Sequence, residues 1–242
     1  MTTFAWFREK PLLVQNVMKS KTKLLFVAAA VLGVIAIAAV VSFLTVDHIA
    51  SATQSRTLRI NCEFDKFRQI MVRKNATAAI IGQSGMTLVD ERIDHVKLDT
   101  TKDDRPLLNA ILGHSKTELD AVKEITVHLD DPSLNADRLV LRQIAEVGPE
   151  AMNVQTRSKE AAGNLEEYQT TLQARPKDGA TELTLRVSMR VRVQVPKIFI
   201  GRADAKVQEA ADNAVNTQAK AIQAFINEHA DERLILPKLS RN

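Results

Sequence analysis

The sequence predicts an α+β protein in which one N-terminal transmembrane helix precedes a curved antiparallel sheet wrapped around a long C-terminal helix. Three observations lead to this fold class. Residues 24–46 carry no charge, residues 183–195 alternate between apolar and polar side chains, and residues 204–229 carry an apolar stripe at helical spacing. Repeats of 2.0 and 3.6 residues distinguish a strand from a helix.

The uncharged run predicts a membrane anchor. At 1.5 Å per residue, a helix over 24–46 would be about 34 Å long, enough to cross a hydrocarbon core of about 30 Å. Residues 1–23 form a basic segment with five Lys and Arg against one Glu, whereas the twenty residues after the run hold three Lys and Arg. This bias predicts a cytoplasmic N-terminus and an extracytoplasmic C-terminal domain, periplasmic if the organism is bacterial.

Two other interpretations of the run stay open. A buried core helix seldom has more than about 14 uninterrupted apolar residues, so the run is long for one. A cleaved signal peptide would use Ala50-Ser51-Ala52 as its small-residue cleavage site. The apolar region of a signal peptide is typically about 7–15 residues, which favours a retained anchor.

Residues 47–56 are small and polar and predict a short linker, followed by one domain at 57–230 and a tail at 231–242. The domain opens with a strand at 57–63 and a helix at 64–81, because Phe64, Phe67 and Ile70 recur at helical spacing. Further strands are expected at 85–98, 124–129, 138–147 and 152–158. Residues 105–122 fit either a short helix or an inserted flap.

The end of the domain carries the clearest pattern. Every odd residue from Leu183 to Val195 is apolar, which predicts a long strand with one buried face. Turn-forming residues at 176–179 and an alternating stretch at 168–174 complete a hairpin before it. After Pro196 the period changes, and residues 204–229 form an amphipathic helix whose alanines permit close approach to a sheet.

This order of elements resembles the helix-grip fold of the START and polyketide-cyclase-like (SRPBCC) superfamily. The resemblance covers residues 57–230 and is strongest over 180–229, where VRVQVPKIFIGRADAKVQEAADNAVNTQAKAIQAFI links the last strand to the final helix. It implies a ligand-binding gap between sheet and helix. The superfamily has no invariant catalytic motif, so the resemblance transfers no functional residue.

Candidate binding residues follow from this arrangement. The apolar pocket would be lined by odd residues of the last strand and by the helix stripe, and the alternative is that the same residues are only core. The candidates are Val187, Met189, Val191, Ile222 and Phe225.

The same strand carries a candidate basic face made of Arg186, Arg190 and Arg192. This face would bind anionic lipid head groups or an acidic partner. The alternative is a solvated outer face whose arginines pair with Glu167 and Glu182.

Composition and motifs argue against several other functions. The five histidines lack metal-binding spacing, and a single cysteine excludes an intramolecular disulfide. No nucleotide-binding or nucleophile motif occurs, so we expect no catalytic residue, cofactor or metal site. A net charge of +4 and 4% aromatic residues argue against a nucleic-acid partner.

The leading hypothesis is therefore a membrane-anchored domain that binds a lipid or another apolar small molecule without catalysing a reaction. The main alternative is a structural subunit with a filled core that docks onto a larger membrane-protein assembly. An enzyme such as a cyclase or hydrolase is the third class. Paired polar side chains inside the cavity would favour it.

Overall fold

The computed structural model describes residues 31–33, 35, 37, 40, 45–74, 76–83, 86–105, 109 and 116–232. The chain divides into two compact units, residues 1–46 and residues 47–242.

The first unit contains the whole of the predicted anchor, residues 24–46, although Thr45 and Val46 are strand residues and not helical as expected. Its described residues from 31 to 40 are helical, and their apolar side chains are 52% to 66% exposed. The rest of the run up to residue 44, and all of the basic segment 1–23, lie outside the described residues. Within the described part of the chain, no helix is both long enough and apolar enough to cross a bilayer.

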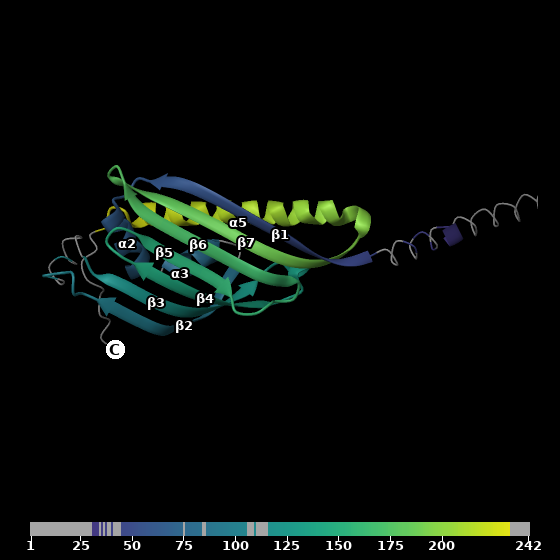
Figure 1. The fold of residues 1–242 in the computed structure, drawn as a ribbon, viewed down its shortest axis with the longest axis horizontal. Coiled ribbons are helices and arrows are strands. Elements are labelled where there is room, and N and C mark those ends of the chain that lie inside the picture. The colour runs from purple at the N-terminus through teal and green to yellow at the C-terminus, as the bar shows by residue number, and fades with distance from the viewer. Residues whose placement is uncertain are drawn as a thin grey trace, which may run out of the picture. The chain divides into compact units, whose positions relative to one another are not determined.

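The second unit is built on one antiparallel sheet, to which the described residues contribute seven strands (Figure 1). Its order is β1-β7-β6-β5-β4-β3-β2, with β1 and β2 at the edges. The strands are β1 (Thr45–Ile60), β2 (Met86–Asp99), β3 (Glu118–Leu129), β4 (Arg138–Val147), β5 (Met152–Ser158), β6 (Leu165–Lys177) and β7 (Ala180–Pro196). The sheet and the long terminal helix together make a helix-grip-like α+β fold.

The alternation at the end of the sheet is confirmed in β7. Leu183, Leu185 and Val187 are at most 2% exposed and face the core, whereas Arg186 and Arg190 point to the outer face. A strand with one buried face pins its own register, because a slip of one residue would exchange the two faces.

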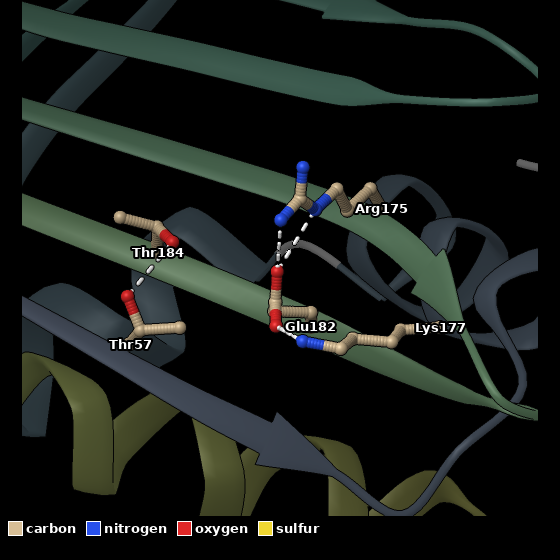
Figure 2. A network of polar contacts seen from close by, with 5 residues as sticks. All are labelled: Thr57, Arg175, Lys177, Glu182 and Thr184. Carbon is tan, nitrogen blue, oxygen red and sulfur yellow. Dashed lines mark hydrogen bonds and ion pairs between the residues drawn. The ribbon is translucent and has the colours of Figure 1, made fainter.

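The predicted linker at 47–56 is corrected by the structure, because these residues belong to β1. Ala50 and Ala52 are 0% and 5% exposed and pack into the core. On the other face, Thr53 hydrogen-bonds to Ser188 of β7, at 3.0 Å between hydroxyl oxygens. Thr57 bonds in the same way to Thr184 of β7, also at 3.0 Å (Figure 2). The strand could not be recognised from the sequence because alanine and serine have little intrinsic preference for strands, so their conformation depends on pairing with a neighbouring strand.

Two short helices replace the single helix expected at 64–81. Helix α2 (Phe64–Arg73) buries Phe64, Phe67 and Ile70. Its C-cap residue is Lys74, whose backbone N–H donates to the Ile70 carbonyl. Helix α3 (Ala76–Gln83) follows and packs against β2.

The terminal helix α5 (Ile200–His229) begins four residues earlier than predicted, directly after the 3-10 turn η2 (Lys197–Phe199). Its buried stripe packs on β7, and Ala211 and Ala219 on that stripe are at most 2% exposed. Helix α3 contacts α5 as well as β2, so the three helices cover the concave face of the sheet.

The remaining strands follow the predicted order. Two register shifts, at Leu88/Asp90 and Ile93/His95, explain why the pattern of β2 is irregular. The expected helix or flap at 105–122 is partly corrected, because 118–122 are the start of β3, whereas 106–108 and 110–115 lie outside the described residues. The last ten residues of the predicted tail also lie outside them.

Candidate functional site

A cavity of about 180 Å³ lies between the concave face of the sheet and the helices. Most of its lining is apolar and comes from β3 to β7 and from all three helices. Representative lining residues are Met71, Ile80, Ala121, Val154, Leu172 and Ile222. An apolar lining with a few placed polar groups is typical of small-molecule sites.

One row of polar side chains crosses this apolar face. Cross-strand pairing aligns Lys123 of β3 with Gln143 of β4, Gln143 with Thr156 of β5, and Thr156 with Thr170 of β6. All four residues line the cavity. We call them the polar row.

Hydrogen bonds join most of the polar row in a fixed direction, through Thr77 of α3. Lys123 Nζ donates to Thr77 Oγ1 at 3.3 Å, Thr77 Oγ1 donates to Gln143 Oε1 at 3.3 Å, and Gln143 Nε2 donates to Thr156 Oγ1 at 3.1 Å. Each group donates a hydrogen bond to the next one. The last acceptor of this chain of bonds is the Thr156 hydroxyl.

At the outer end of the polar row, the positive charge of Lys123 is neutralised by the carboxylate of Glu91. Lys123 Nζ lies 2.6 Å from Glu91 Oε1 of β2, and the two side chains are 22% and 18% exposed. A pair held away from water interacts more strongly than a surface pair. The ion pair leaves the cavity without a net charge at this end.

The inner end contains a second polar pair. Gln218 of α5 donates a hydrogen bond of 2.7 Å from Nε2 to the hydroxyl oxygen of Tyr168 on β6, and both residues are 8% exposed. Burial raises the pKa of the Tyr168 phenol to about 12, and the bond from Gln218 opposes this only partly. Tyr168 is therefore a neutral phenol at physiological pH.

Of the five predicted pocket residues, one lines the cavity and four pack in or against the core. Ile222 lines the cavity. Val187, Met189 and Phe225 are at most 8% exposed and pack in the core, and Val191 packs partly buried against it. The structure thus brings the five residues together in the core near β7, and the cavity lies mainly over β3 to β6.

The predicted basic face lies on the outer side of the sheet. Arg190 lies 3.6 Å from Glu167, and Arg192 lies 2.7 Å from Glu166, both on β6. Arg186 is exposed on the same face. Glu182 accepts hydrogen bonds from Arg175 and Lys177 at the end of the hairpin (Figure 2).

Other titratable groups do not gather into a site. Among the described residues, no three His, Cys, Asp or Glu side chains lie close enough together to hold a metal ion. Cys62 is 8% exposed, and burial raises the pKa of its thiol.

Sequence reasoning missed most of the cavity's polar groups. The polar row depends on the register of four strands, which no local pattern reveals. Gln218 was the one visible signal, because it is a polar residue within the apolar stripe of the terminal helix. A buried polar side chain requires a partner, and here the partner is Tyr168.

No protein-family model matches the sequence, and no curated protein matches it either. Solved structures that resemble the fold include a protein from Thermus thermophilus, at 10% identity and a TM-score of 0.46, over 75% of this chain and 99% of that chain.

Two further structures are Ara h 8.0201, at 11% identity and a TM-score of 0.42, and the Zhui aromatase/cyclase from Streptomyces sp. R1128, at 12% and 0.40. They cover 74% and 78% of this chain, and 99% and 97% of their own chains. Likeness at this level gives no basis for transferring a ligand or an activity.

Proposed function

We propose that residues 47–242 bind an apolar small molecule in the cavity without catalysis, and that residues 24–46 hold the chain in a membrane. The observation that carries the proposal is a mostly apolar cavity of about 180 Å³ between the sheet and the helices. For scale, a dry apolar cavity of about 150 Å³ binds benzene. The ligand, or the part of it that enters, is therefore small.

Membrane anchoring is supported by the uncharged run and by the position of the alternative cleavage site. Ala50 and Ala52, which a signal peptidase would read, are buried in the sheet as part of β1. Cleavage after Ala52 would remove the first half of an edge strand. A retained anchor keeps β1 whole and would keep the cavity close to a bilayer, where apolar molecules concentrate.

Ligand binding is tested on the full-length chain purified in mild detergent. Solvent extraction followed by mass spectrometry should identify a bound apolar molecule. Ala145→Phe places a larger side chain into the cavity and should abolish binding. Ile144→Phe is the matched control, because Ile144 is the neighbouring residue on the outer face and is 40% exposed. A chain that carries no apolar molecule and takes up none would contradict this function.

Anchoring is tested separately by fractionation. The intact chain should stay with the membrane pellet after alkaline carbonate washing and should retain its N-terminal residues. A soluble form that begins near residue 53 would refute the anchor, whereas the proposal of ligand binding is decided by its own experiment.

A second function, as a subunit of a membrane-protein assembly, is favoured by the edge strand β2. Ile93, Val96 and Leu98 lie opposite cavity-side residues of β3, yet they are 53% to 61% exposed. Exposed apolar groups of this kind often mark contact surfaces. A stoichiometric protein partner after gentle purification, with no bound small molecule, would favour this function.

The paired polar side chains inside the cavity are the feature that would favour an enzyme. Lys123 is held by Glu91, and the Tyr168 phenol keeps its proton far above neutral pH. The phenol is therefore no ready base at pH 7, and the Lys123 ammonium is occupied by its carboxylate partner, so binding takes precedence over catalysis in the proposal.

A further inference from the structure

We infer that the inner end of the cavity recognises a single hydroxyl group on a neutral ligand about the size of phenol, through Tyr168 and Gln218. This inference rests on the proposed binding function and adds to it the chemical class of the ligand and the direction in which it enters.

Tyr168 and Gln218 leave part of their hydrogen-bonding capacity unused. The Tyr168 hydroxyl accepts from Gln218 and keeps its own hydrogen, and Gln218 keeps its Oε1 acceptor. No described residue is bonded to either group. If the amide is turned the other way, Tyr168 donates to Oε1, and the pair still leaves at least one donor and one acceptor.

A hydroxyl group is the chemical match for this pair. It can accept from one member and donate to the other at the same time, which a carbonyl or an ether oxygen cannot do. Since both side chains are 8% exposed and line the cavity, a ligand that left them unpaired would bear the cost of two buried polar groups.

The orientation of the ligand follows from where the unused polar groups of the cavity lie. At the outer end, Lys123, Thr77 and Gln143 bond mainly to one another and to Glu91, so they offer little to a ligand. At the inner end, no described residue accepts a hydrogen bond from the Thr156 hydroxyl, and Thr170 lies beside it on β6. Unused polar groups therefore collect around Tyr168, at the buried end.

The cavity is more open along the strands away from Tyr168, at the level of Leu172 and Ala174 of β6. Val72, which lines the cavity from α2, is 45% exposed, and Leu119 and Ala145 are partly exposed. A ligand would enter between α2 and the ends of β3 and β4 with its hydroxyl leading, and its apolar body would lie against residues such as Ala121 and Val154.

The charge of the ligand follows from the charged groups of the lining. Lys123 is the one basic side chain among the described residues of the lining, and Glu91 neutralises it. An anionic ligand would find no free counter-charge there and would lose its hydration. The ligand is therefore neutral.

The test uses the full-length chain in mild detergent, labelled with 13C at the methionine methyl groups. Met71, Met86 and Met152 all line the cavity, and their signals report its occupation. The probes are phenol, toluene and benzoate, at pH 7. Dialysis against a common reservoir sets the free concentration of each, because toluene partitions into micelles.

We expect phenol to bind at least as tightly as toluene, even though water hydrates phenol better, and benzoate to bind at least about tenfold more weakly than phenol. Tyr168→Phe and Gln218→Leu should each shift the ratio of the two dissociation constants toward toluene by about tenfold or more. Ile222→Val, one turn from Gln218 and also in the lining, should change both affinities equally.

Three results would overturn the inference while leaving the proposed function intact. Toluene could bind at least about tenfold more tightly than phenol, the ratio could stay unchanged in both variants, or benzoate could bind best. Failure of all three probes to move the methionine signals would refute the binding function, and this inference with it.

Discussion

The side chain of Thr181, at the start of β7, donates a hydrogen bond of 2.8 Å to the backbone carbonyl of Cys62, in the turn between β1 and α2. Thr181 is 0% exposed, so neither group can turn to water instead. The bond fixes the turn against the sheet just before α2 begins.

Thr181→Val should lower the free energy of unfolding by about 1–3 kcal/mol, because valine keeps the shape and leaves the Cys62 carbonyl unpaired. Urea unfolding followed by circular dichroism measures this. Thr184→Val is the matched control on the same strand. It removes a hydroxyl contact to Thr57 at the surface (Figure 2) and should cost no more than about 0.5 kcal/mol. Equal losses in both variants would contradict the role of the Cys62 carbonyl.

Tyr168 is the single tyrosine of the chain, so tyrosinate absorbance reports on this residue alone. In the folded protein the absorbance should rise only near pH 12, and in the urea-unfolded protein near pH 10. The unfolded state then binds fewer protons between these values, so stability should fall as pH rises across them, by up to roughly 3 kcal/mol. Tyr168→Phe should lack both the absorbance change and this part of the pH dependence. A folded midpoint near 10 would show that the phenol is not buried.

Substituting two glycines with positive φ would distinguish the cost of backbone strain from the cost of steric overlap. Gly179 has φ +71° with open space around it, whereas a Cβ at Gly163, with φ +56°, would lie 2.2 Å from the Leu134 carbonyl oxygen. That carbonyl ends the 3-10 turn η1 (Pro132–Leu134). Gly179→Ala should cost about 1–2 kcal/mol from the left-handed conformation alone. Gly163→Ala should cost at least twice as much in the same unfolding experiment, and equal costs would exclude the overlap.

Glu182 should make the β6–β7 hairpin sensitive to acid. Hydrogen bonds from Lys177, and then from Arg175, hold the pKa of this carboxyl below its usual value (Figure 2). A lowered pKa gives stability that is present above the unfolded pKa and lost as pH falls through the folded pKa. Glu182→Gln should therefore reduce the loss of stability below about pH 4.5, the ordinary range of a Glu pKa. Glu228→Gln, on the exposed side of α5, should leave the acid response unchanged.

The elements that could be predicted from the sequence are those with one buried face. Residues 183–195 and 204–229 repeat at the periods of a strand and a helix, and both patterns correspond to β7 and α5. Strand β1 was missed over 47–56 because its buried positions include alanines, whose small side chains resemble linker composition. Pairing with β7, which is more than 100 residues away, makes this segment a strand.

The cavity was harder to locate for a related reason. Val187 and Phe225 face the interior as their spacing implies, but α5 packs directly on β7 and fills that region. Space remains over β3 to β6, where α2 and α3 form the cover, and its position depends on how far each helix stands from the sheet. Sequence periodicity identifies the inward face and carries no information on that separation.

The position of β1 also constrains how this protein reaches its native state. In the sheet β1 borders only β7, and His48 and Arg56 on it bond to Asp204 and Asn216 of α5. Among the described strands, β1 thus has no native neighbour until β7, more than 100 residues later, has been synthesised. Contacts so distant along the chain slow folding. The sheet can therefore be completed only after β7 has been synthesised, and β1 must stay unpaired and protected from aggregation until then.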